Sequence, residues 1–237
     1  MSLPFRFKEF TVHQDRCAMK IGTDGVLLGS WVPMGDVINS ILDVGSGTGV
    51  IALMMAQRSS AQVIDAIEID DSAYEQAVEN FEASNWSDRL FCYHASFQEF
   101  FQEIDDVYDL IISNPPFFTE NYKSLNDVRN MARFEDSLPF EHLFMGVSQL
   151  LSEKGKFALI IPSREEDNVL DIAEKVGLFP HMITRVRGNM SSEIIRSLLL
   201  FGFDKVTSKE EELIIEKSRH TYTDAYIGLT KEFYLKM

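Results

Sequence analysis

Apolar residues in the middle of the chain fall into short continuous runs that alternate with stretches of helical periodicity. Continuous apolar runs are typical of strands buried on both faces, whereas apolar residues three and four positions apart are typical of helices packed on one side. The alternation predicts an α/β fold with a mostly parallel sheet and helices on both faces. The strands are expected at 41–44, 63–67, 108–113 and 156–161, and the helices between them at 50–58, 72–81 and 138–151.

The N-terminal segment and the second half of the chain follow other patterns. Residues 5–10 alternate aromatic and charged side chains, as an edge strand or a hairpin arm does. Residues 153–155 predict the turn into the strand at 156–161. The longest expected loop runs from about 117 to 137, and its length suggests a lid that grips a substrate. Further strands are expected at 179–186, 195–201 and 213–215.

The composition fits one domain. A chain of 237 residues with 45% hydrophobic residues can bury one sizeable core, and no repeat or linker divides it. Neither an apolar span nor a secretory signal is visible at the N-terminus, so a cytoplasmic protein without a membrane partner is expected. Cys17 and Cys92 are then expected to be reduced, small buried residues. Neither they nor the five scattered histidines suggest a metal site.

A glycine-rich turn joins the first predicted strand to the helix that follows it. Glycines tolerate positive φ and let a ligand approach the backbone closely, here at a switch point of the sheet. After the next strand, Glu68 follows the first glycine at about the distance along the chain at which an acidic residue meets ribose hydroxyls in nucleotide-binding folds. Asp70 or Asp71 fits better than Glu68 as the cap of the helix that follows. The candidate cofactor-binding residues of this region are Asp43, Gly45, Gly47, Gly49 and Glu68.

The spacing of this turn distinguishes two classes of cofactor. A dinucleotide fingerprint needs Gly-x-Gly-x-x-Gly and a helix N-terminus that faces a pyrophosphate. This turn is Gly-x-Gly-x-Gly and follows Asp43, which is badly placed for a pyrophosphate and well placed for a cationic amino acid moiety. The arrangement resembles the class I S-adenosylmethionine-dependent methyltransferases, whose loop holds the methionine part and whose next acidic residue holds the ribose. The resemblance implies S-adenosyl-L-methionine as the cofactor and makes nicotinamide chemistry less favoured.

A second motif follows the strand at 108–113 and consists of Asn114, Pro115, Pro116 and Phe117. A conjugated amine is a poor nucleophile that needs positioning more than deprotonation, and the Asn114 side-chain oxygen and the Pro115 carbonyl can each accept one of its N–H groups. The prolines restrict the loop, and Phe117 can stack on a planar group. Asn-Pro is also an ordinary turn, and the aromatic residue can simply cap the core. Within the methyltransferase class, the motif resembles that of enzymes acting on adenine N6 or on glutamine side-chain amides.

The two motifs, with residues 5–10, 15–29 and 222–226, together resemble the bacterial tRNA1(Val) adenine-N6 methyltransferases over nearly the whole chain. The resemblance implies one Rossmann-like domain over 1–237, with an N-terminal arm and lid segment at 1–36 lying over the cofactor and a catalytic core at 37–237. It implies methyl transfer from S-adenosyl-L-methionine to N6 of adenine 37 in that tRNA.

In this family, Lys20, Thr23 and Asp24 would belong to the segment that closes over the cofactor. Otherwise, Thr23 or Asp24 would cap a helix around 26–31. One departure from the family pattern follows a further strand expected near 91–94, where an acidic residue usually faces the cofactor adenine. This chain has Ser96 there, and a serine hydroxyl can still hydrogen-bond an exocyclic amine.

The net charge of −15 argues against a nucleic-acid substrate, because phosphate binding depends on lysine and arginine. The acidic residues concentrate at 99–106, 165–167 and 210–216, however, and can form solvated faces away from the site. The cations that could form a basic rim are Arg6, Lys8, Arg16, Lys123, Arg129, Arg133, Arg185 and Arg187. Arg16, Arg129 and Arg133 are the candidates for binding a tRNA, and the last two are spaced for one helical face.

Two other functions stay open. A protein glutamine methyltransferase would share the Asn-Pro-Pro-aromatic site and suit an acidic surface, but it would not need the basic residues of the N-terminal arm. A non-catalytic protein that binds S-adenosylmethionine or RNA would keep the fold, although Asp43, Glu68 and Asn114 argue against it.

Overall fold

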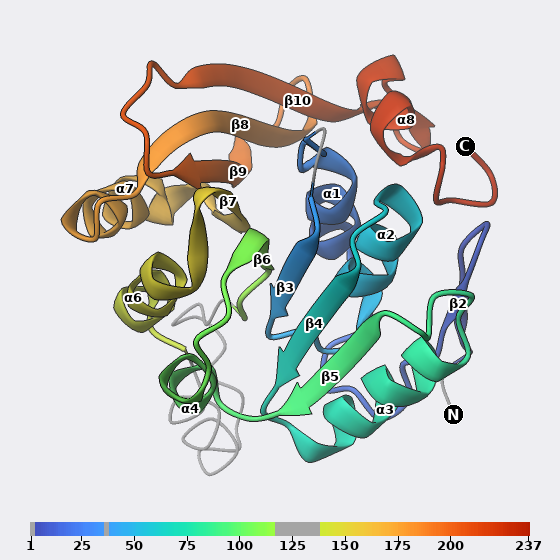
Figure 1. The fold of residues 1–237 in the computed structure, drawn as a ribbon. Coiled ribbons are helices and arrows are strands. Elements are labelled where there is room, and N and C mark those ends of the chain that lie inside the picture. Colours follow the sequence, from blue (N-terminus) through green and yellow to red (C-terminus); the bar gives the residue numbers. More distant parts are fainter. Residues whose placement is uncertain (1–2, 36–37, 117–137) are drawn as a thin grey trace, which may run out of the picture.

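A computed structural model of the chain describes residues 3–35, 38–116 and 138–237. Within these residues the main sheet has nine strands in the order β11-β10-β8-β9-β7-β6-β3-β4-β5. Its parallel half comprises β3 (Ser40–Val44), β4 (Val63–Glu68), β5 (Leu90–His94), β6 (Tyr108–Ser113) and β7 (Leu151–Pro162). The predicted α/β fold with a mostly parallel sheet is confirmed (Figure 1).

The other half of the sheet is mixed. It comprises β8 (Phe179–Asn189), β9 (Ile194–Gly202), β10 (Lys209–Ser218) and β11 (Thr221–Tyr222). Strand β9 pairs antiparallel with both β7 and β8, whereas β10 pairs parallel with β8. Strand β10 therefore runs in the same direction as β3, β4 and β6, and its carboxyl end lies on the same edge of the sheet.

Two hydrophobic clusters, one on each face of the sheet, hold the helices in place. The first packs α1 (Thr23–Trp31), α2 (Val50–Arg58), α3 (Asp71–Glu82) and α8 (Asp224–Thr230), and the second packs α4 (Phe97–Glu103), α6 (Phe140–Leu150) and α7 (Glu166–Lys175). Figure 1 shows α4, α6 and α7 together on one side of the sheet and α1, α2 and α8 on the other. A short 3-10 helix, η1 (Ser163–Glu165), precedes α7.

The N-terminal segment forms a small hairpin of β1 (Phe5–Arg6) and β2 (Thr11–Val12), separate from the main sheet. A single antiparallel bridge joins Phe7 to Tyr234, so the N-terminal hairpin meets the C-terminal segment. Figure 1 shows the hairpin and the segment after α8 on the same side of the molecule. Phe7, Phe10 and Phe233 are buried in the first cluster. The aromatic positions of this segment therefore pack inward.

The turn predicted at 153–155 is wrong, because these residues lie within β7. The pairing of β6 with β7 shifts between Tyr108 and Leu110, where Leu151 opposes Tyr108 and Lys156 opposes Leu110. A Cβ added at Gly155 would lie 2.9 Å from the Tyr108 carbonyl oxygen. The glycine thus marks a close approach of two backbones at an irregular strand pair. In the part of the chain that the structure describes, no helix is long and apolar enough to cross a membrane.

Candidate active site

A cavity of about 350 Å³ lies at the carboxyl ends of β3, β4 and β6. Open α/β sheets place ligands at this edge, where strand ends and the following turns supply the lining. The glycine turn, Glu68, Ser96 and Asn114 all contribute to the cavity wall, and Cys17 and Met19 approach from the N-terminal segment. One cavity thus brings both sequence motifs together.

The backbone of the glycine turn has a conformation that residues with a side chain rarely adopt. Gly45, Gly47 and Gly49 have φ values of 74°, 55° and 76°, in the left-handed region. The backbone N–H groups of Gly45 and Ser46 both donate to the Ile67 carbonyl, which ties the turn to β4. A Cβ added at Gly45 or Gly47 would meet no atom within 4 Å. The turn is therefore held from behind and has open space beside these two glycines.

Glu68 links this turn to the start of α3. Its Oε2 accepts the Gly47 N–H at 2.8 Å, and its Oε1 accepts the N–H groups of Ile69 and Asp70 at 2.9 Å each. Asp70 accepts the Ala73 N–H and caps α3, as expected for a residue at this position. The carboxylate of Glu68 consequently lies in the cavity wall at the place where two loops meet.

Asp43 lies behind the turn and does not line the cavity. Its side chain is fully buried, and its Oδ2 accepts the Ala52 N–H at 3.1 Å in the first turns of α2. Burial raises the pKa of this carboxyl to about 7, opposed by the Ala52 hydrogen bond, and the Glu68 carboxylate raises it further. Its Oδ1 has no hydrogen-bond partner among the described residues. Asp43 therefore acts on the turn through the backbone of α2.

Asn114 follows directly after β6 and lines the cavity with Pro115 and Pro116. The strand end is fixed because the Ser113 hydroxyl donates to the Val44 carbonyl at 2.9 Å. A Cβ added at Gly25 would lie 3.7 Å from the Asn114 amide nitrogen, so α1 comes close to this side chain. Phe117 lies outside the described residues.

Ser96 lines the cavity but has a structural role that the sequence analysis missed. Its hydroxyl accepts the Glu99 N–H, and the Glu99 carboxylate accepts the Ser96 hydroxyl and backbone N–H groups. This capping box starts α4, and the Ser96 hydrogen bonds lower the pKa of Glu99. The signal was the spacing Ser-x-x-Glu, which predicts a helix start.

The segment before α1 contributes residues other than those expected. Cys17, Ala18 and Met19 line the cavity, whereas Lys20, Thr23 and Asp24 do not. Asp24 instead pairs with Arg196 of β9 at 2.8 Å. The N-cap of α1 is Gly22, without a side-chain cap, so the alternative in which Thr23 or Asp24 caps this helix is wrong.

Cys17 and Met19 carry no motif that could have revealed them. The chain brings them to the cavity by folding the N-terminal segment over α3, where the Arg16 N–H donates to the Gln76 side chain. Burial, with the nearby carboxylates of Glu68 and Asp70, raises the pKa of the Cys17 thiol to about 11. The thiol of Cys17 therefore favours its protonated form at neutral pH. Both cysteines are half-buried free thiols, less enclosed than expected.

Among the described cations of the expected basic rim, Arg16, Arg185 and Arg187 form ion pairs with acidic residues, whereas Arg6 and Lys8 form none. Arg16 pairs with Glu75 and Glu79. The remaining pairs join Arg185 to Glu166 and Glu210, and Arg187 to Glu212. Lys123, Arg129 and Arg133 lie outside the described residues. Across 3–35, 38–116 and 138–237, no group of three His, Cys, Asp or Glu residues could hold a metal ion.

The parallel sheet, the glycine turn and the Asn-Pro-Pro loop at its carboxyl edge define a class I methyltransferase. The fold matches the crystal structure of a protein described as a predicted O-methyltransferase from Agrobacterium tumefaciens. That match has a TM-score of 0.68 at 19% identity and covers 89% of this chain and 96% of the other. The family model "Methyltransferase small domain" matches residues 21–176.

Curated relatives extend the match over the full length. The tRNA1(Val) (adenine(37)-N6)-methyltransferase of Christiangramia forsetii is 57% identical over 236 residues, which cover 99% of this chain and 98% of the relative. The protein of that name from Flavobacterium johnsoniae is 58% identical over 234 residues, or 98% of this chain and 100% of the relative. The chain belongs to the tRNA1(Val) (adenine(37)-N6)-methyltransferase family.

Proposed function

We propose that this protein transfers a methyl group from S-adenosyl-L-methionine to N6 of adenine 37 in tRNA1(Val), in the cytoplasm. The observation that carries the proposal is the single cavity in which the glycine turn and Asn114 share a wall. A methyl donor held by the turn and an amine held by Asn114 would lie next to each other there. The activity of the full-length relatives supports the same substrate.

The residues around the glycine turn fit the cofactor. Open space beside Gly45 and Gly47 leaves room for a ligand against the backbone, and the adjoining Glu68 carboxylate can accept hydrogen bonds from ribose hydroxyls. We assign Asp43 and Gly49 a supporting role behind the turn, and Ser96 a place near the adenine. Lys20, Thr23 and Asp24 stay predicted members of a segment that closes over the ligand. S-adenosyl-L-methionine supplies an electrophilic methyl group that an amine can attack.

Asn114 and Pro115 orient the substrate amine in this proposal. The Asn114 side-chain oxygen and the Pro115 carbonyl each accept one N–H of adenine N6, which directs the nitrogen lone pair toward the methyl donor. Pro116 restricts the loop, and Phe117 stacks on the base. The nitrogen becomes acidic as it gains the methyl group and then loses a proton to solvent. Asn114 is therefore an orienting residue and no general base is needed.

The adenine must leave its helical stack to reach this cavity, as other bases do in enzymes that modify them. We propose that Arg16, Arg129 and Arg133 contact the phosphates of the RNA. Arg16 would then exchange one carboxylate for a phosphate, because Glu75 and Glu79 share its guanidinium group. Both carboxylates are more than half exposed, so water can replace the arginine at little energetic penalty.

Methyl transfer from radiolabelled S-adenosyl-L-methionine to unmodified tRNA1(Val), followed by nucleoside analysis, tests the proposed function. We expect N6-methyladenosine, and we expect no label in a matched transcript with guanine at position 37. A protein extract serves as the parallel acceptor. Label in the protein fraction alone would replace the proposal with glutamine methylation, and label in neither fraction would leave a non-catalytic binding protein.

A further inference from the structure

A second hollow lies on the molecule and contains the C-terminal motif at 222–226. It encloses about 620 Å³ between the N-terminal hairpin, the segment before α1, the end of β10 and the C-terminal segment. Four aromatic residues contribute to its wall, together with two cations and one acidic residue, Glu216. The lining residues that matter here are Phe5, Arg6, Tyr222, Tyr226, Tyr234 and Lys236.

The wall of this hollow is built from packed elements. Tyr226 is buried in the first cluster, and its ring lies 5.1 Å from the ring of Tyr222, centroid to centroid. Tyr234 is bridged to Phe7 and lies 6.2 Å from Phe5 on the same measure. Burial raises the pKa of both Tyr226 and Tyr234, and the neighbouring Tyr222 raises both further. The aromatic surface therefore exists before any ligand arrives.

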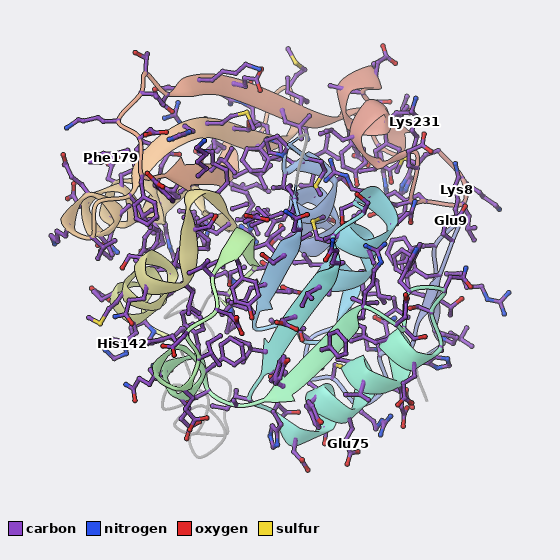
Figure 2. All side chains as sticks on the ribbon, viewed as in Figure 1. Lys8, Glu9, Glu75, His142, Phe179 and Lys231 are labelled. Carbon is purple, nitrogen blue, oxygen red and sulfur yellow. The ribbon has the colours of Figure 1, made fainter. Side chains whose placement is uncertain are left out.

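The segments around this hollow have a net positive charge, whereas the whole chain has a net negative charge. Segments 1–10 and 216–237 hold six lysines and arginines against four acidic residues, whereas the whole chain has 22 against 37. The two segments meet where Lys8 Nζ donates to the Lys231 carbonyl at 2.6 Å (Figure 2). Within the described residues, Arg6 and Lys236 have no ion-pair partner. The acidic protein thus has a locally cationic region around an aromatic hollow.

One short segment of the chain lines both the candidate active site and the hollow, with different residues in each. Cys17 and Met19 line the active-site cavity, and Ile21 and Thr23 line the second hollow. Two residues of extended chain span at most about 7 Å, so the two walls approach closely. Both also lie on the carboxyl edge of the sheet, since β10 runs parallel to β8 and in the direction of β6.

We propose that this hollow binds a second unpaired nucleotide of the RNA loop that presents the adenine to Asn114. The inference rests on the proposed function and extends its binding site. Unstacked bases bind on aromatic side chains and their phosphates pair with nearby cations, which is the combination found here. The base stacks against the Tyr222 side of the hollow, and Arg6 and Lys236 contact the adjoining phosphates. This surface gives an acidic enzyme cations for its RNA that no acidic side chain occupies.

Binding and methylation of an anticodon stem-loop RNA test the inference. Tyr222→Leu keeps an apolar residue but removes the π face, whereas Tyr222→Phe keeps the face. We expect Tyr222→Leu to weaken RNA binding and raise KM for RNA about tenfold, the order of one lost stacking contact. Tyr222→Phe should restore binding to near the wild-type value. kcat and the Kd for S-adenosyl-L-methionine should stay unchanged in both.

A charge pair provides the second arm of the test. Arg6→Gln with Lys236→Gln should raise KM for RNA and make the salt dependence of binding shallower, because two phosphate contacts are lost. Lys154→Gln with Lys175→Gln removes the same charge from exposed positions outside both hollows and should change neither quantity.

The outcomes separate the two proposals. If the wild-type protein methylates the RNA and the Tyr222 and Arg6/Lys236 variants bind RNA as wild type does, the inference is overturned and the proposed function stays intact. RNA binding that depends on these residues, without methylation of RNA, would support the inference and overturn the proposed function. A wild-type protein that binds no RNA would overturn both.

Discussion

In the proposed mechanism, Asn114 is the residue on which methyl transfer depends most directly. Replacing it with alanine removes an acceptor for the substrate amine but leaves the glycine turn and Glu68 in place. We expect Asn114→Ala to lower kcat at least about a hundredfold, since a small loss of alignment has effects of that order. The Kd for S-adenosyl-L-methionine, measured by calorimetry, should stay within about twofold of wild type.

Asn85→Ala is the matched control for this prediction, because Asn85 is exposed in the turn after α3. It should leave both quantities unchanged. If Asn114→Ala turned over as fast as wild type at saturating RNA, the orienting role would have to pass to the backbone of the Asn-Pro-Pro loop alone.

Asp43 gives the fold a particular dependence on pH. Burial raises its folded pKa to about 7 from 3.8, so between these values the folded protein holds a proton that the unfolded chain has lost. The contribution of this group to the free energy of unfolding therefore falls as pH rises through this window. Asp43→Asn should remove that contribution, and the variant should gain stability relative to wild type from about pH 4 to about pH 7.

Urea unfolding of wild type and Asp43→Asn across this range measures the difference. Asp88→Asn removes the charge of an exposed aspartate and controls for net charge. A constant difference between wild type and Asp43→Asn at every pH would mean that Asp43 is ionised in the folded protein throughout.

At the level of single residues, sequence spacing predicted that Gly45, Gly47, Glu68 and Asn114 would lie together, because strand ends in a parallel sheet share an edge. Gly49 and Asp43, predicted with them, do not line the cavity. Sequence spacing did not locate Cys17 and Met19, which reach the cavity only because the N-terminal segment folds back over α3. Ser96 was predicted to contact the ligand, although Glu99, three residues later, forms a capping box with it. A local motif predicts hydrogen bonds between nearby residues, whereas contacts between segments far apart in the sequence cannot be predicted from local spacing.

Among the elements, the join between the glycine turn and α2 tolerates change least. Gly49 has a φ of 76°, and a Cβ added to it would lie 2.5 Å from the Phe81 ring of α3. The left-handed backbone and the steric overlap both oppose a side chain. We expect Gly49→Ala to lower the free energy of unfolding by at least about 3 kcal/mol, measured by urea unfolding.

Gly177 separates these two causes. It has a φ of 78° after α7, but a Cβ added there would meet no atom within 4 Å. Gly177→Ala should therefore lose only about 1–2 kcal/mol from backbone strain. Equal losses at both glycines would show that the Phe81 ring moves aside without penalty.

The buried parallel strands were the most predictable elements, because they read as continuous apolar runs. Helices α4 and α7 were missed for different reasons. Residues 165–167, at the start of α7, were interpreted only as an acidic face, although Val169, Ile172 and Ala173 follow at helical spacing and are buried. The residues 97–103 contain three phenylalanines in seven positions, a composition that does not distinguish a helix from a strand.

For the molecule as a whole, the two ends of the chain stabilise one shared core. Phe233 is 1% exposed in the first cluster, which also contains Phe7 and Phe10 from the N-terminal hairpin. Phe233→Ala should lower the free energy of unfolding by about 3–5 kcal/mol, as expected for an aromatic residue removed from a core. Urea unfolding followed by tryptophan fluorescence measures the change, because Trp31 and Trp86 pack in or against the same cluster.

Leu235 is the control, since it is 57% exposed two residues further on. Leu235→Ala should change stability by less than about 0.5 kcal/mol. If Phe233→Ala were equally mild, the C-terminal segment would contribute little to the stability of the core.

The meeting of the two chain ends also bears on how the protein is handled in the laboratory. Met237 lines the second hollow, and the Phe7–Tyr234 bridge brings the N-terminal hairpin to the same place. A purification tag attached after Met237 would begin at the wall of the hollow. Kinetic comparisons with RNA therefore require a tag that is cleaved from this position, or a tag inserted in a surface loop on the opposite edge of the sheet.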